Sequence, residues 1–158
     1  MVIRPATIDD SEALVQLRIE LMREMGHVRD EEVRVFADAT RKYLARALPA
    51  GEFLAWVAEE RAVVATSGLV LFRRPPSPLH LMGMEAYLLN MYTVPVWRGK
   101  GIASALMHEI LTNVRELGIE RVWLHATEDG RPLYERTGFT PNPTAMELVI
   151  LGDRDDGR

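Results

Sequence analysis

Several residue types that carry common chemistries are missing or scarce in this chain of 158 residues. There is no cysteine, which excludes disulfides, a cysteine nucleophile and thiolate metal ligands. The four histidines are scattered without metal-ligand spacing, so we expect no metal. No apolar run reaches the roughly 18 residues of a membrane helix, and no signal segment is recognisable. We therefore expect a cytoplasmic protein with no membrane partner.

Basic residues are outnumbered by acidic ones, 19 to 23. The formal net charge is −4 and the pI is about 5.6, which disfavours a nucleic-acid partner. Hydrophobic residues, by contrast, make up 47% of the chain, enough for one domain with a real core. No repeat or linker divides the sequence. We expect a single domain over residues 1–151, followed by a polar tail at 152–158.

A glycine-containing loop between a predicted strand and a predicted helix is the most informative stretch. Residues 86–94 are rich in β-branched and aromatic side chains, and Pro95 should end that strand. Helical spacing then relates Ile102, Leu106, Ile110, Val114 and Leu117. Gly99 and Gly101 allow positive φ and close approach of a ligand, while the first helical N–H groups lack partners. The loop therefore predicts an anion site.

Better-known phosphate motifs do not fit this loop. A Walker loop needs Ser or Thr after Gly-Lys, but Gly101 follows Lys100. A dinucleotide fingerprint needs a third glycine where this chain has Ser104. A kinase-type loop lacks its companion motifs. Taken alone, the loop leaves an ordinary turn as the alternative.

Three segments together resemble the GNAT (Gcn5-related) N-acetyltransferase superfamily. Arg98-x-x-Gly101-x-Ala103 is similar to that family's Arg/Gln-x-x-Gly-x-Gly/Ala loop. Residues 133–139, Leu-Tyr-Glu-Arg-Thr-Gly-Phe, resemble its Leu-Tyr-Glu-x-x-Gly-Phe segment, and residues 3–10 its first strand and helix start. The segments occur in the family's order, and the resemblance covers about residues 2–150.

The patterning predicts an α/β fold with alternating strands and helices. Strands are expected at 2–4, 53–59, 63–72, 86–94, 121–126 (buried) and 146–151, with a further one near 139. Helices are expected to start near Asp10, Asp30, Ile102 and Asp129. The resemblance implies a GNAT-like α/β (α+β mixed) domain, whose mixed sheet is splayed at its centre and flanked by helices.

The resemblance also implies that acetyl-CoA is the acetyl donor. Its pantetheine arm would enter the wedge between the strand carrying Met91 and Thr93 and the strand at 122–126, and its pyrophosphate would meet the loop amides. Arg98 is a better candidate than Lys100 for a specific phosphate contact. The cofactor-binding residues implied are Met91, Tyr92, Thr93, Arg98, Gly99, Lys100, Gly101, Ile102 and Ala103.

The chemistry implied is direct acetyl transfer to a primary amine of a small-molecule or peptide acceptor. A backbone amide near Met91 or Tyr92 would stabilise the oxyanion. Tyr134 occupies the family's general-acid position, although a tyrosine packed under the cofactor is the alternative. A non-catalytic CoA-binding or regulatory module is the alternative for the whole protein. The intact loop together with Tyr134 favours the enzyme.

The proton acceptor and the acceptor pocket are less well defined by sequence. Glu85 is the candidate base; the alternatives are Glu20, Glu24 or a water chain. His125 is expected to be a hydrogen-bonded structural residue. Candidate acceptor-wall residues are Met22, Met25, His27 and Arg29. Many family members have Asn and Ala where this chain has Thr127 and Gly130, and exposed edge strands suggest a homodimer.

Overall fold

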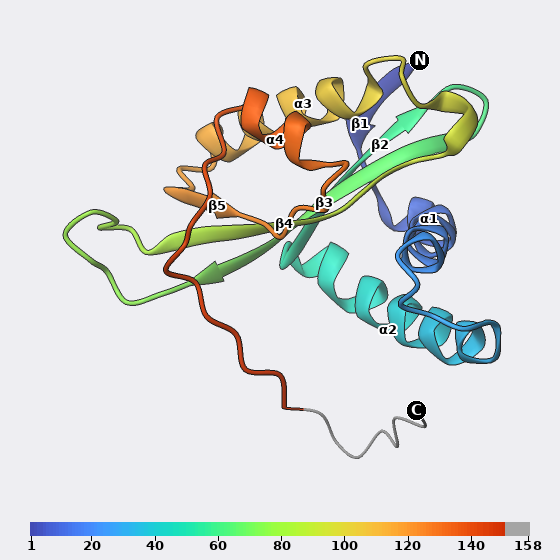
Figure 1. Ribbon diagram of the computed structural model, residues 1–158, viewed down its shortest axis with the longest axis horizontal. Coiled ribbons are helices and arrows are strands. Elements are labelled where there is room, and N and C mark those ends of the chain that lie inside the picture. Colours follow the sequence, from blue (N-terminus) through green and yellow to red (C-terminus); the bar gives the residue numbers. More distant parts are fainter. Residues whose placement is uncertain (151–158) are drawn as a thin grey trace.

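The computed structural model describes residues 1–150 and confirms the predicted mixed α/β fold (Figure 1). One sheet has the order β1-β2-β3-β4-β5; β1 to β4 are antiparallel neighbours, and β5 pairs with β4 in parallel. Its strands are β1 (Val2–Pro5), β2 (Phe53–Glu59), β3 (Val63–Arg73), β4 (Met84–Thr93) and β5 (Arg121–Trp123). The helices are α1 (Ser11–Glu24), α2 (Val33–Ala50), α3 (Ile102–Glu116) and α4 (Arg131–Arg136), with short turns η1 (Ile8–Asp10), η2 (Asp30–Glu32) and η3 (Pro95–Trp97).

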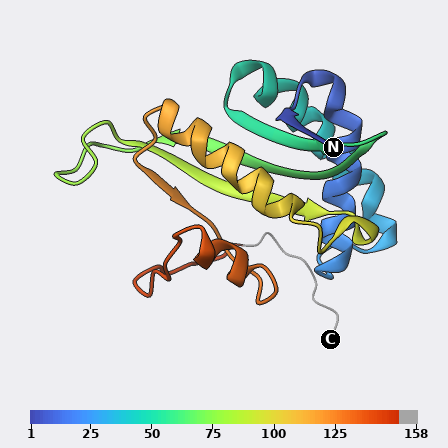
Figure 2. The same ribbon diagram turned by 90° about the horizontal axis from the view of Figure 1, so that it is seen from above.

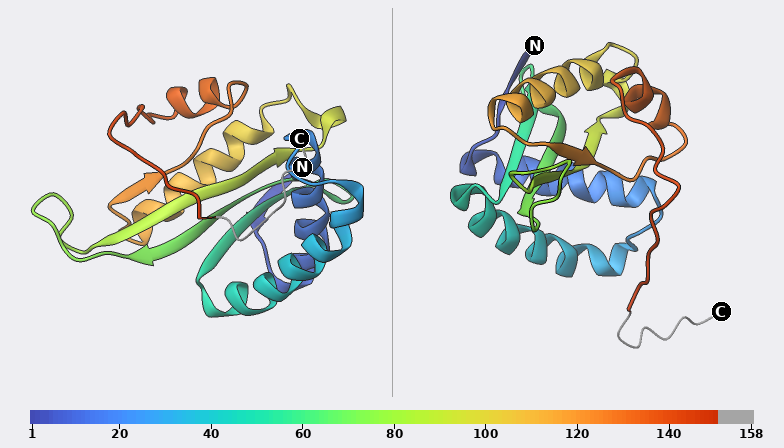
Figure 3. Two further views of the ribbon diagram at one scale, coloured as in Figure 1. Left: turned by 60° about the horizontal axis from the view of Figure 1, so that its bottom comes forward. Right: turned by 90° about the vertical axis from the view of Figure 1, so that its left-hand side faces the viewer.

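The helices cover the two faces of the sheet in separate layers. Helices α1 and α2 lie on one face, and α3 and α4 lie on the other (Figure 3). Each layer buries its own apolar cluster, since alternate strand residues point to opposite faces. The α3 cluster contains the periodic residues Ile102, Leu106, Ile110 and Val114, as the sequence predicts. Leu117, the last of that series, is 48% exposed because the helix has ended.

A partly buried ion pair joins the start of the sheet to the start of α1. The Arg4 guanidinium donates to both Asp10 carboxylate oxygens at 2.8 and 2.9 Å. Asp10 also accepts the Thr7 backbone N–H at 2.7 Å, so its carboxylate faces back along the chain and does not cap α1. The Arg4 hydrogen bond is the main reason why the pKa of the Asp10 carboxyl lies below its ordinary value.

A β-bulge interrupts β4 shortly before the glycine loop. Thr66 pairs with Tyr92 and Gly68 pairs with Leu89, so the single residue between them on β3 opposes two on β4. Asn90 lies in the bulge, and among residues 1–150 it is the one non-glycine residue with positive φ, at 58°. Arg18 of α1 donates to the Asn90 side-chain oxygen. The bulge is therefore fixed from the helix layer.

The C-terminal part of the sheet differs from the sequence prediction. Strand β5 ends at Trp123 and not at Ala126, and it is not buried, since Trp123 is 37% exposed. Residues 146–150 form no strand, and neither does the chain around Phe139; Leu151 and the predicted tail lie outside the described residues. Met146 is 99% exposed. Residues 146–150 form no strand because a β-prone sequence forms one only where a neighbouring strand pairs with it.

Two other segments depart from the compact layers. The β3–β4 loop at 74–83 projects away from the body of the protein (Figure 2). The segment after α4 crosses the β5 edge from the α3 side to the α1–α2 side (Figures 1 and 3).

Helix α4 begins at Arg131, two residues later than predicted, because Thr127 Oγ1 accepts the Gly130 N–H at 3.2 Å and closes a turn first. Across residues 1–150, no helix has the length and apolarity needed to cross a membrane.

Candidate active site

The glycine loop presents a row of unpaired amides at the start of α3. Gly99 and Gly101 have φ values of +73° and +77°, which L side chains rarely adopt. The first hydrogen bond of the helix runs from Ala105 N–H to Gly101 O at 3.0 Å. No acceptor within residues 1–150 takes a hydrogen bond from the N–H groups at 99–104. A Cβ added at either glycine meets nothing within 4 Å, so the loop has open space beside both glycines.

The two basic side chains of the loop have different partners. Arg98 Nη2 lies 2.8 Å from both carboxylate oxygens of Glu24, and Arg98 Nε donates to Thr93 O at 2.8 Å. The Lys100 ammonium lies over the Trp97 ring, 4.4 Å from its centroid. Arg98 thus anchors the loop to α1, whereas Lys100 contacts Trp97 in the same turn.

Glu24 also holds Tyr92, which lies at the end of β4. The Tyr92 hydroxyl donates to Glu24 Oε1 at 2.8 Å. Burial would raise the pKa of the Glu24 carboxyl, but the hydrogen bonds from Arg98 and Tyr92 outweigh it and leave the pKa lowered. Burial, followed by the bond to Glu24, raises the pKa of Tyr92 to about 12. The Tyr92 side chain is therefore committed to this contact, and only its backbone is available to a ligand.

Strands β4 and β5 separate before they reach the loop. They pair only at Glu85↔Arg121, Ala86↔Val122 and Tyr87↔Trp123. Beyond Tyr87, no residue of the described chain extends this ladder, although β4 continues for six residues to Thr93. We call this divergence of β4 from residues 124–126 the fork. Its β4 side offers backbone groups that an extended amide chain could pair with.

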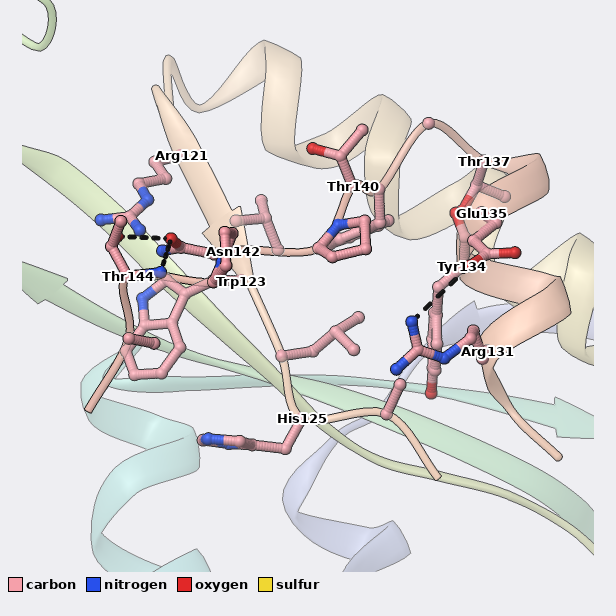
Figure 4. Close-up of a pocket in the computed structure, with 18 of the residues that line it drawn as sticks. Arg121, Trp123, His125, Arg131, Tyr134, Glu135, Thr137, Thr140, Asn142 and Thr144 are labelled. Atoms are coloured by element: carbon pink, nitrogen blue, oxygen red, sulfur yellow. Dashed lines mark hydrogen bonds and ion pairs between the residues drawn. The ribbon is translucent and has the colours of Figure 1, made fainter. Parts of the chain in front are cut away.

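Tyr134 lies on the α3 side of the fork. Its ring belongs to the α3 cluster and packs edge-on against Phe139 at 5.9 Å between centroids. Only 9% of the residue is exposed, and this burial raises the pKa of the Tyr134 phenol. Tyr134 lines a cavity of about 1400 Å³ bounded by residues 121–126, α4 and the chain at 137–147 (Figure 4).

A second group of rings lies on the opposite face of the fork. Val122 and Leu124 pack against the α3 cluster, so alternation points Trp123 and His125 to the other face. Figure 4 shows these two side chains on one side of the β5 segment and Tyr134 on the other. The Tyr87 hydroxyl lies 2.8 Å from His125 Nδ1, and the Tyr87 ring packs against Trp123 at 4.7 Å.

Glu85 lies further along β4, inside an ion-pair cluster. Its carboxylate is 3.2 Å from Arg74 and 3.6 Å from Arg121, and only 4% of the residue is exposed. Both Arg74 and Arg121 line the cavity, whereas Glu85 is not among the described residues that do. The structure therefore does not bring Glu85 to the cavity surface together with Tyr134.

The candidate acceptor-wall residues lie around the end of α1. Met22 is half-buried, while Met25, His27 and Arg29 are exposed. Arg29 is paired with Glu32 at 3.0 Å. These side chains flank the α1 end that carries Glu24, and so lie nearer the glycine loop than the β5 end of the sheet.

Comparison with known proteins identifies the family of this chain. The sequence matches the Acetyltransferase (GNAT) family over residues 12–139. The chain belongs to the GNAT acetyltransferase family. It is an acetyl-CoA-dependent N-acetyltransferase, and as a GNAT enzyme it acts on an amine acceptor.

Three relatives illustrate this membership. A GCN5-related N-acetyltransferase from Ralstonia eutropha has a crystal structure with a TM-score of 0.85 and 38% identity, covering 96% of this chain and 99% of that one. A predicted acetyltransferase from Clostridium acetobutylicum, crystallised with acetyl-CoA, gives 0.83 and 27% over 94% and 95%. An uncharacterized N-acetyltransferase of Escherichia coli K12 is 29% identical over 142 residues, or 87% of this GNAT chain and 81% of the relative.

Sequence reasoning named the glycine loop and Tyr134 as candidates but missed the contacts that hold this region together. The Glu24–Arg98 and Tyr87–His125 contacts join residues far apart in the chain, and no local pattern marks such pairs. Asn90 had a usable signal, since asparagine inside a β-branched and aromatic run is a common left-handed residue. Thr127, where many members have Asn, uses its hydroxyl to close the turn before α4.

Proposed function

We propose that this enzyme transfers the acetyl group of acetyl-CoA directly to a primary amine of a small-molecule or peptide acceptor. One observation carries the proposal. The fork between β4 and β5 leads to the unpaired amides at 99–104, with Tyr134 on one side of it. An extended amide chain ending in a pyrophosphate fits this combination of an open strand edge and an amide cradle.

Individual residues would hold the donor in the following way. The amides of Gly99 to Ala103 would bind the pyrophosphate at the positive end of α3. The open β4 edge at Met91 to Thr93 would pair with the amides of the pantetheine arm. Arg98 adds positive charge beside the loop while Glu24 keeps it in place. Lys100, over Trp97, adds a second positive charge at the same turn.

The thioester supplies an acyl carbon that a neutral amine can attack once both are held in contact. The chain must then stabilise negative charge on oxygen and protonate the departing sulfur. We assign the first task to the backbone N–H at Met91 or Tyr92, next to the bulge. The second falls to Tyr134, because burial keeps its phenol protonated at neutral pH. Glu85 as the proton acceptor stays a prediction.

A matched pair of glycine substitutions tests the donor site. Gly101→Glu should weaken acetyl-CoA binding at least tenfold, because its carboxylate would enter the pyrophosphate position. Gly118→Glu is the control: Gly118 lies at the other end of α3, has φ +67° and also has nothing within 4 Å of an added Cβ. It introduces the same charge and similar backbone strain away from the loop. Calorimetric titration with acetyl-CoA gives the affinities, and urea unfolding confirms that both variants are folded.

Acceptor transfer is then measured as thiol release on a pooled library of primary amines. Release with some amines, lost in Gly101→Glu and retained in Gly118→Glu, is the expected result. Equal acetyl-CoA affinity in the two variants would remove the assignment of the loop. Tight binding with no thiol release from any primary amine would remove the assignment of the acceptor class.

A further inference from the structure

His125 is placed at the fork, on the face opposite Tyr134. It stands two residues after Trp123, the last β5 residue paired with β4. Extending the parallel register puts His125 level with Leu89, next to the bulge at Asn90. His125 and Tyr134 line the same cavity although they lie on opposite faces of the sheet. A group held in the fork would therefore have a phenol on one face and an imidazole on the other.

The surroundings of His125 differ from those of a structural core histidine. The residue is exposed, and its one hydrogen bond within residues 1–150 joins Nδ1 to the Tyr87 hydroxyl at 2.8 Å. Its ring packs edge-on against Tyr87 at 5.7 Å and Trp123 at 6.0 Å between centroids. These contacts hold the ring in place through Nδ1 and leave Nε2 without a protein partner in the described chain. The sequence predicts a hydrogen-bonded structural histidine, and the contact with Tyr87 supplies that hydrogen bond but does not account for the open Nε2.

The ionisable groups around His125 come from every neighbouring element. Tyr87 is on β4; burial raises the pKa of its phenol, a hydrogen bond from the His125 backbone lowers it, and Glu147 raises it, so that the pKa is raised overall. The Tyr87 phenol thus stays protonated at neutral pH. The other charged or titratable residues lining the cavity are Arg74, Arg121, Arg131, Tyr134, Glu135 and Glu147. Arg131 and Glu135 pair with each other at 3.7 Å, and Arg74 and Arg121 face Glu85.

We propose that His125, oriented by Tyr87, accepts the proton of the attacking amine on the face of the fork opposite Tyr134. This inference rests on the proposed acetyl transfer and names its proton acceptor. Tyr87 acts as a positioning residue: with Nδ1–H donating to the Tyr87 oxygen, the lone pair of the neutral ring is on Nε2. His125 takes this role in place of Glu85, whose carboxylate is buried against two guanidinium groups.

The step balances without any further reactant. The amine nitrogen forms a bond to the acyl carbon and gives one proton to His125 Nε2. The carbon–sulfur bond breaks, its electron pair leaves with sulfur, and Tyr134 gives the thiolate one proton. Water carries the proton from His125 back to the Tyr134 oxygen, which restores both residues. Acceptor amines therefore approach from the α1–α2 side of the sheet.

The test compares His125→Ala, Tyr87→Phe and the control His108→Ala, which removes an exposed histidine from α3. His125→Ala should lower kcat/KM for an amine about 10²-fold while leaving acetyl-CoA affinity by calorimetry within about twofold. The acidic limb of the wild-type kcat/KM profile should disappear in this variant. Added imidazole should restore part of the rate. His108→Ala should match wild type.

A spectroscopic measurement tests the proposal without turnover. Nitrogen-15 NMR of the imidazole should show the Nδ1–H tautomer of His125 in the wild type and a mixture of tautomers in Tyr87→Phe. A dominant Nε2–H tautomer in the wild type would overturn the proposal. An unchanged acidic limb in His125→Ala, or its loss in Glu85→Gln instead, would overturn it as well. Failure of the proposed function is distinct, since it would appear as wild-type protein that releases no thiol with any amine.

Discussion

Glu24 and Arg98 join the first helix to the glycine loop, although they lie 74 residues apart in the chain. Arg98 Nη2 meets both Glu24 oxygens at 2.8 Å, and Tyr92 donates to the same carboxylate. The arrangement ties α1, the end of β4 and the loop to one point. Arg98 can thus have two roles, as an anchor for the loop and as positive charge for the phosphates.

Substitutions at the two ends of this ion pair separate the roles. Arg98→Ala should weaken acetyl-CoA binding about tenfold, since it removes a charge-assisted phosphate contact. Glu24→Gln should leave binding equal or tighter, because it removes a negative charge beside the loop. Calorimetric titration at low and high salt measures both. If the two variants lose affinity to the same extent, Arg98 serves only as an anchor.

Tyr134→Phe should separate binding from chemistry. Without the phenol, kcat should fall about 10²-fold while acetyl-CoA affinity stays within about twofold. Tyr43→Phe, in the α2 layer against Phe53, is the matched control. Because burial raises the pKa of Tyr134, the phenol is protonated at neutral pH, and its ionisation should not limit the rate there. Unchanged turnover would return Tyr134 to a packing role.

The bulge at Asn90 should tolerate glycine and reject a β-branched residue. Asn90→Val places a β-branched side chain at φ 58°, which should cost about 1–2 kcal/mol of stability and move the Met91 amide. Asn90→Gly keeps the backbone and loses only the contact with Arg18. Urea unfolding and kcat measure both effects. A valine variant as stable and active as the glycine variant would show that the bulge does not position the oxyanion donor.

Asp10 should make the protein sensitive to acid. Its pKa is lowered in the folded state, chiefly by the Arg4 hydrogen bond, so its stabilising effect is complete above the ordinary value near 3.9. The effect is lost as pH falls through the lowered pKa. Asp10→Asn should cost about 2 kcal/mol at pH 7, and the difference from wild type should shrink below pH 4. Urea unfolding at pH 7 and pH 3 checks this, and a difference independent of pH would contradict it.

The features that sequence determined are those with local causes. Gly99, Gly101 and the apolar series starting at Ile102 lie within one turn and one helix, so their spacing alone predicts the amide cradle. The hairpin of β2 and β3 is likewise predicted from its local sequence pattern. Where pairing partners decide, sequence reasoning failed: residues 146–150 have the composition of a strand but form none, and β5 is three residues shorter than predicted.

What only the tertiary structure decided is how distant residues share the fork. Tyr134 and His125 are nine positions apart, yet which face each occupies depends on how β5 packs against α3. Glu85 stays the candidate base of the sequence analysis, and only the fold shows that its carboxylate faces Arg74 and Arg121. Tyr87 and Glu24 acquired their partners in the same way. Periodicity and turn conformation depend on neighbouring residues in the sequence. The partners of a side chain depend instead on how the packed layers bring distant segments together.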